Sequence, residues 1–96
     1  MEAPGVIEWD DEKNRTLQAE RSICFEDVLE AIESGRILAD EAHPNPASYG
    51  HQRILVVEID GYACVVPYVQ EGNKRFLKTI YRSRVYQEKY LSSHRP

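Results

Sequence analysis

The sequence predicts one mixed α+β domain, in which two N-terminal helices pack on an antiparallel meander sheet of three to four strands and a C-terminal helix closes the chain. Apolar residues first recur with helical spacing, then alternate or run together as in strands, and return to helical spacing near the end. Ninety-six residues suit a single domain over 1–96, with a structured core expected over 6–92.

The N-terminal third is expected to hold a short strand and two helices. A strand is predicted over 6–9, with Asp10 as the N-cap of a helix over 11–21, because its carboxylate can accept from the free N–H groups of the first turn. Apolar side chains at i, i+3, i+4 and i+7 from Phe25 predict a second helix. Gly35 ends that helix, since glycine readily takes the left-handed conformation.

After Gly35 the pattern is typical of strands. The segment 41–50 contains two prolines, an Asn and a Gly, which predicts a loop. Asp60-Gly61 is a strong hairpin signal. Pro67 lacks an N–H donor, so its strand should be at an edge there, bulged, or near its end. The strands of the meander are predicted over 36–40, 53–59, 62–69 and 75–81.

Charge is unevenly distributed along the chain. The net charge is −4, but residues 1–72 carry 5 Lys+Arg and 15 Asp+Glu, whereas residues 73–96 carry 7 Lys+Arg and a single acid. The basic end includes the predicted closing helix, which Ser83 could cap. A clustered basic patch can bind a polyanion even on an acidic protein, although a solvated helix would show the same pattern.

Several classes of protein are disfavoured. No apolar run approaches the roughly 18–20 residues that span a bilayer, and the N-terminus lacks the features of a secretory signal, so a cytoplasmic protein with no membrane partner is expected. Cys24 and Cys64 lie in apolar patterns without CxxC spacing, which predicts buried free thiols rather than a disulfide framework.

Cofactor and metal motifs are likewise not found. The glycines form no phosphate-binding loop, and no nucleophile elbow is present, so no cofactor is predicted. Four potential ligands lie in or beside one loop, but their spacing matches no tight metal motif, and no metal site is predicted from them: Asp40, Glu41, His43 and His51.

The basic C-terminal segment also contains tyrosines, a mixture that suits single-stranded RNA. Metal-free RNA cleavage needs a base to deprotonate the ribose 2′-OH, cations to stabilise charge at phosphorus, and an acid for the leaving oxygen. Lys78, Arg82 or Arg84 could stabilise that charge, and His51 or a tyrosine could move protons. The alternative is structural, with tyrosines that pack the helix onto the sheet and cations that are simply solvated.

The chain resembles the BrnT family of bacterial toxins, which belong to type II toxin–antitoxin modules. The similarity spans roughly residues 7–91 and combines several short segments. These are Glu8-Trp9-Asp10 with Lys13-Asn14, Phe25-Glu26, Asp40-Glu41-Ala42-His43-Pro44, Gln52-Arg53, and Ile80 with Ser83-Arg84 through Tyr90.

This resemblance implies a RelE-like fold and a metal-independent endoribonuclease that inhibits translation by cutting RNA, such as mRNA on the ribosome. It also implies a cognate antitoxin encoded by a neighbouring gene. Arg53 and Arg84 match two arginines of the family, and Lys78 corresponds loosely to a basic residue of its last strand. The predicted catalytic residues are therefore Arg53, Lys78, Arg84 and His51, and the predicted RNA-binding residues are Arg82, Tyr81, Tyr86 and Lys89.

A second hypothesis remains open from the sequence. The chain could be a catalytically inert toxin-like domain that serves as a protein-interaction module, with the acidic residues 1–72 facing a basic partner.

Overall fold

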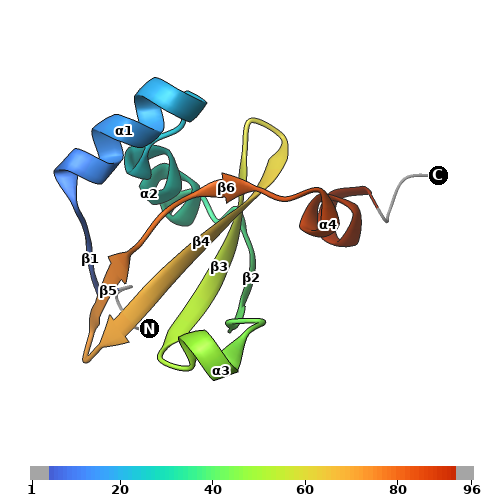
Figure 1. The fold of residues 1–96 in the computed structure, drawn as a ribbon. Coiled ribbons are helices and arrows are strands. Elements are labelled where there is room, and N and C mark those ends of the chain that lie inside the picture. The colour runs from blue at the N-terminus through green and yellow to red at the C-terminus, as the bar shows by residue number, and fades with distance from the viewer. Residues whose placement is uncertain (1–4, 93–96) are drawn as a thin grey trace.

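A computed structural model describes residues 5–92 and confirms the mixed α+β class. Helices and strands are arranged around one twisted sheet (Figure 1). In chain order the elements are β1 (Val6–Trp9), α1 (Asp11–Arg21), α2 (Phe25–Glu33), β2 (Ile37–Ala42), α3 (Pro46–Tyr49), β3 (Gln52–Ile59), β4 (Tyr62–Glu71), β5 (Lys74–Leu77), β6 (Tyr81–Arg82), α4 (Arg84–Tyr86) and the π-helix η1 (Gln87–Ser92).

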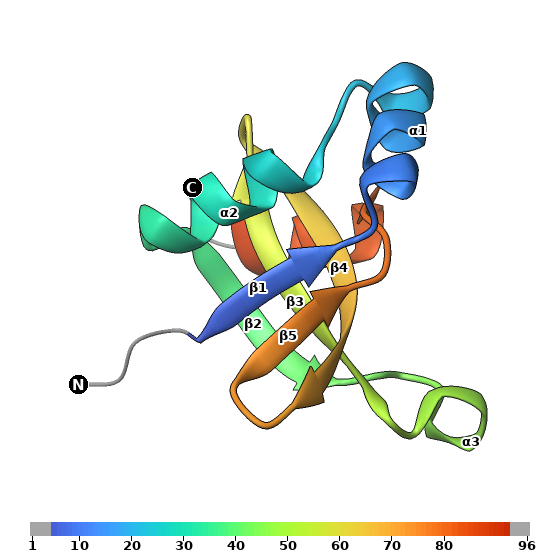
Figure 2. The ribbon, with the colours of Figure 1, turned by 90° about the vertical axis from the view of Figure 1, so that its left-hand side faces the viewer.

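The sheet is larger than the three to four strands predicted. Six strands form it, in the order β1-β5-β4-β3-β2, with β6 paired to β4 beside β5. Strands β2 to β5 form the predicted antiparallel meander, whereas β1 joins the far edge parallel to β5 (Figure 2). The prediction did not include β1 in the sheet, because its partner lies more than 60 residues away in sequence.

Two predicted segments also need correction. The strand predicted over 36–40 continues to Ala42, and the loop predicted over 41–50 contains the short helix α3, which begins at Pro46. Proline is well suited to a first helical turn, where its missing N–H would have no partner within the helix. A helix therefore interrupts the strands, and the predicted order of helices first and strands afterwards is wrong at this point.

Pro67 explains why the strand predicted over 75–81 is divided. Its Cα partner on β3 is Ile54, and its carbonyl accepts the N–H of Lys78 at 2.8 Å. The N–H and C=O of one strand residue point to the same side, so the missing donor faces the segment around Lys78. The pairing with β5 ends at Leu77, and the pairing with β6 begins only at Tyr81.

The two faces of the sheet are covered differently. The first, here called the α1–α2 face, carries Leu55, Val66 and Leu77 and packs against Leu17, Phe25 and other residues of the two helices in the main core. The second, here called the C-terminal face, carries Ile54, Val56, Ala63 and Val65, which pack against Tyr86, Tyr90 and Leu91 in a smaller cluster. Side chains alternate between these faces along each strand.

The two N-terminal helices match their predicted positions. Asp10 accepts a hydrogen bond from the N–H of Glu12 at 3.3 Å, which confirms its role as N-cap of α1. Asn14 links the helices, because its side chain donates to Glu26 at 2.8 Å and accepts from the N–H of Phe25 at 2.7 Å. The ring of Trp9 stacks on that of Phe25, with centroids 5.5 Å apart.

The C-terminal helical segment starts as predicted and ends differently. The hydroxyl of Ser83 accepts from the N–H of Tyr86 at 3.2 Å, which caps α4. The chain then widens into the π-helix η1. Gln87 anchors this turn to the sheet, because its side chain accepts from the N–H of Ala63 at 2.7 Å and donates to the carbonyl of Gly61.

The prediction of two buried free thiols is confirmed in part. Cys24 and Cys64 are both free; Cys64 is buried, whereas Cys24 is only partly buried at the start of α2. No helix within residues 5–92 is long and apolar enough to cross a membrane.

Candidate functional site

The predicted functional residues lie on both faces of the sheet. Arg53 is the Cα partner of Tyr68, which belongs to the main core, so Arg53 lies on the α1–α2 face. His51 is exposed, directly before β3. Lys78 follows β5 and contacts Phe76, whose side chain lies on the C-terminal face because it alternates with the core residue Leu77.

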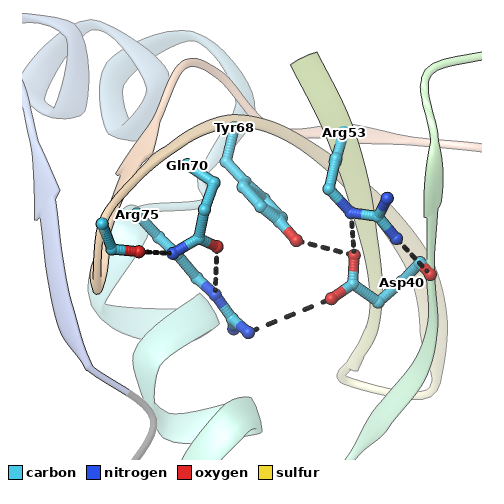
Figure 3. A network of polar contacts seen from close by, with 6 residues as sticks. Asp40, Arg53, Tyr68, Gln70 and Arg75 are labelled. Atoms are coloured by element: carbon cyan, nitrogen blue, oxygen red, sulfur yellow. Dashed lines mark hydrogen bonds and ion pairs between the residues drawn. The ribbon is translucent and has the colours of Figure 1, made fainter. Parts of the chain in front are cut away.

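Arg53 is part of a polar network around the carboxylate of Asp40 (Figure 3). Its Nε donates to Asp40 Oδ1 at 3.1 Å, and its Nη2 donates to the Asp40 carbonyl at 3.0 Å. The hydroxyl of Tyr68 donates to the same Oδ1 at 2.7 Å. Arg75 approaches Oδ2 from the other side at 4.0 Å, and its guanidinium lies 5.4 Å from the centroid of the Tyr68 ring.

Within this network, the charged and polar groups are partnered by one another. Burial raises the pKa of Tyr68, and its hydrogen bond to Asp40 raises that pKa further, so the phenol stays a neutral donor. Gln70 accepts from Arg75 and donates to the carbonyl of Gly72. The contacts join side chains from β2, β3, β4 and β5. Such an arrangement is well suited to holding strands in register, and it leaves the Arg53 guanidinium engaged with Asp40.

On the C-terminal face, Lys78 stands beside a hollow of about 310 Å³. Its ammonium lies 5.3 Å from the centroid of the Phe76 ring, which is within cation–π range. A second, more open hollow of about 600 Å³ adjoins it and shares Phe76 and Lys78. Together the two hollows are lined by Glu8, Asp10, Lys13, Val69, Glu71, Lys74, Phe76, Leu77 and Lys78.

A second group of aromatic and basic residues lies on the C-terminal helical segment. Tyr86 and Tyr90 stack with centroids 5.9 Å apart, and the ammonium of Lys89 is 5.9 Å from the first ring and 5.2 Å from the second. The hydroxyl of Tyr90 donates to the carboxylate of Glu41, which raises the pKa of Tyr90 and ties the segment to β2. Burial raises the pKa of Tyr86.

The other predicted residues lie between these groups. Tyr81 is the Cα partner of Val65 and therefore shares the C-terminal face, where its ring is exposed. Arg82 pairs with Cys64 and is directed to the α1–α2 face. Arg84 is exposed at the start of α4.

Lys78, Tyr81 and Tyr86 thus lie on the C-terminal face and Arg53 on the other, but Lys78 lies near the β1–β5 edge of the sheet, whereas Tyr86 and the neighbouring Lys89 lie toward β3 and β2. Sequence reasoning missed Phe76 and Glu71, which line the hollow beside Lys78. For Phe76 a signal was available, because it is the aromatic residue beside Lys74 and Arg75 in β5.

Neither a metal site nor a similarity to known proteins identifies the function of this chain. Within residues 5–92, no group of three or more His, Cys, Asp or Glu side chains is arranged to hold a metal ion. Comparison of the chain with protein-family models found no match, and comparisons with curated proteins and with solved structures found none either. Function is therefore inferred from the fold and the surface chemistry.

Proposed function

We propose that this chain is the RNA-cleaving toxin of a bacterial type II toxin–antitoxin module, with a RelE-like arrangement of two helices over a meander sheet. The observation that supports it most is the contact of ammonium groups with aromatic rings at two places on the C-terminal face. Lys78 lies over Phe76, and Lys89 lies over Tyr86 and Tyr90.

This chemistry favours single-stranded RNA. Unpaired bases stack on aromatic rings, and lysines attract the phosphates without reading a sequence. The residues concerned come from the basic end of the chain, whereas the acidic residues are concentrated before position 73. Exposed cations such as Lys78, Arg84 and Lys89 can attract a polyanion locally on an otherwise acidic protein.

Cleavage would follow the usual route of metal-free ribonucleases. The 2′-oxygen loses its proton to a base and attacks the adjacent phosphorus, the bond to the 5′-oxygen breaks, and that oxygen takes a proton from an acid. Lys78 and Arg84 are proposed to stabilise the charge that builds on the phosphoryl oxygens. His51 is the proposed proton carrier, and Arg53 holds Asp40 and Tyr68 in place.

The test is growth arrest on induction together with cleavage of a single-stranded RNA by the purified protein in EDTA. Lys78→Ala and Arg84→Ala are each expected to lower cleavage at least tenfold, because one oxyanion-stabilising group contributes about 10²–10³-fold in known enzymes. Arg15→Ala is the matched control, since Arg15 is an exposed cation on α1. Cleavage that survives the loss of both Lys78 and Arg84 would disprove this site.

One observation favours a second candidate, the inert interaction module. Arg53 and Lys78 lie on opposite faces of the sheet, so two of the four predicted catalytic residues do not meet. This candidate predicts no RNA cleavage and no growth arrest, together with a stable complex with the product of the adjacent gene. Co-purification of that product and the cleavage assay, performed on the same preparation, separate the two candidates.

A further inference from the structure

The hollow beside β5 has the size and shape of a small binding site. Its volume of about 310 Å³ lies at the lower end of the range of about 300–1,000 Å³ found for ligand pockets. Phe76 and Val69 are direct Cα partners and supply its apolar surface. Lys74, Lys78, Glu8 and Glu71 supply its charged groups.

Phe76 is partly exposed and is not a member of either apolar cluster described above. A phenylalanine at such a position contributes little to the core, yet its ring is accessible on a sheet surface. Sheet-borne aromatic rings of this kind are the platforms on which single-stranded nucleic acids stack their bases.

The charged groups of the hollow are of two kinds. Lys78 contacts the ring of Phe76, and Lys74 forms an ion pair with Glu8 at 3.7 Å across β5 and β1. Glu71 is exposed at the end of β4, as the Cα partner of Lys74. Lys78 is the cation placed to attract a phosphate, because Lys74 is engaged with Glu8, whereas a carboxylate such as that of Glu71 can only accept hydrogen bonds.

A carboxylate beside a stacked base favours bases that offer it a hydrogen-bond donor. Adenine, cytosine and guanine each present an exocyclic amino group that a carboxylate can accept from, whereas uracil presents only one imino N3–H, between two carbonyl oxygens that repel the carboxylate. Glu71 is the preferred acceptor, because Lys74 already neutralises Glu8.

We infer that the hollow is a nucleotide subsite, in which a base bearing an amino group replaces the Lys78 ammonium over the ring of Phe76 and donates to Glu71, while Lys78 turns to the phosphate and Lys74 stays paired with Glu8. This inference rests on the proposed function, because it names how the same face would hold single-stranded RNA.

The experiment measures binding of fluorescent 2′-O-methyl oligonucleotides of about eight nucleotides, a length within known single-strand site sizes. These probes lack the attacking 2′-OH, so binding is separated from cleavage. The wild-type protein is expected to bind oligo(A) and oligo(C) about fivefold more tightly than oligo(U), the effect of about one hydrogen bond.

Two variants test the two contacts. Phe76→Leu is expected to weaken binding of oligo(A) about tenfold through the loss of stacking. Tyr62→Leu is the matched control, because Tyr62 is a partly buried aromatic of β4 on the α1–α2 face and should leave binding unchanged. Glu71→Gln is expected to reduce the preference over oligo(U) to less than twofold, since an amide can also donate to uracil.

The outcomes are distinguishable from those of the cleavage assay. Equal binding by Phe76→Leu and the wild type, with both folded by circular dichroism, overturns the subsite even where RNA cleavage is observed. Equal binding of all three oligonucleotides by the wild type overturns the role of Glu71. Selective, Phe76-dependent binding without cleavage supports the subsite and refutes the ribonuclease.

Discussion

The two faces of the sheet differ in how they use their polar and aromatic residues. On the α1–α2 face, Phe25 is fully buried and Asp40 is enclosed by Arg53 and Tyr68. On the C-terminal face, Phe76 is partly exposed and lysines lie over aromatic rings. Similar residue types are therefore enclosed on one face and, in the case of Phe76 and the lysines, partly or fully exposed on the other.

The largest expected difference in stability is between two variants that each truncate one phenylalanine, one on each face. Phe25→Ala is expected to lower the free energy of unfolding by about 3–5 kcal/mol, because it empties a fully buried site beside Trp9. Phe76→Ala is expected to cost less than about 1 kcal/mol, since its ring is partly exposed. Urea denaturation of both variants measures the difference, and equal losses would contradict this division between the faces.

Removing the carboxylate at the centre of the polar network should have the next largest effect. Asp40→Ala leaves the buried Tyr68 hydroxyl and the Arg53 guanidinium without their acceptor, and a loss of about 1–3 kcal/mol is expected. Tyr68→Phe removes one hydrogen bond only and should cost about 0.5–1.5 kcal/mol. Chemical denaturation tests both. If Asp40→Ala is as stable as the wild type, the network does not hold the strands.

The α1–α2 face should also make stability depend on alkaline pH. Burial raises the pKa of Cys64 to about 11 from 9.0, so the unfolded chain loses this proton first. The free energy of unfolding should therefore fall as pH rises from 9 to 11, by roughly 1 kcal/mol after allowance for solvent screening. Denaturation at several pH values checks this. Cys64→Ala should remove the part of the decrease that begins near pH 9, and an unchanged profile would refute the assignment.

The smallest effect is expected on the C-terminal face. Tyr90→Phe removes the hydrogen bond to Glu41 while keeping the stack on Tyr86, and it should leave the free energy of unfolding close to that of the wild type. Hydrogen exchange should nevertheless speed up for amides in η1, because this bond ties the segment to β2. Faster exchange throughout the main core instead would show that the C-terminal segment is part of the global fold.

The helices and strands that depend on neighbouring residues, such as caps and apolar runs, were predictable from the sequence. Asp10 capped α1, Ser83 capped α4, and the apolar runs on either side of Asp60-Gly61 located β3 and β4. The pairing of β1 with β5 was not predictable, because an edge strand of four residues carries no pattern that names its partner. The division of the last predicted strand depended on the partner of Pro67, which the sequence alone does not specify.

The sequence indicated which residue types the candidate site contains, but not on which face of the sheet each residue lies. The mixture of basic and aromatic residues near the C-terminus pointed to the surface that carries Lys78, Tyr86 and Lys89. The resemblance to the toxin family grouped Arg53 with them, because a motif match does not specify which face of a strand the residue occupies. One register position decides the face of a strand residue, and Arg53 shares its face with Tyr68.

The parallel pairing of β1 with β5 has a consequence for the order of folding. Residues 6–9 can complete the sheet only after residues 74–77 have been synthesised and have paired with β4, so β1 is expected to dock late. The ion pair between Glu8 and Lys74 forms at that step and closes one wall of the hollow. The nascent chain would thus acquire its proposed nucleotide subsite only when residues 6–9 have paired with residues 74–77.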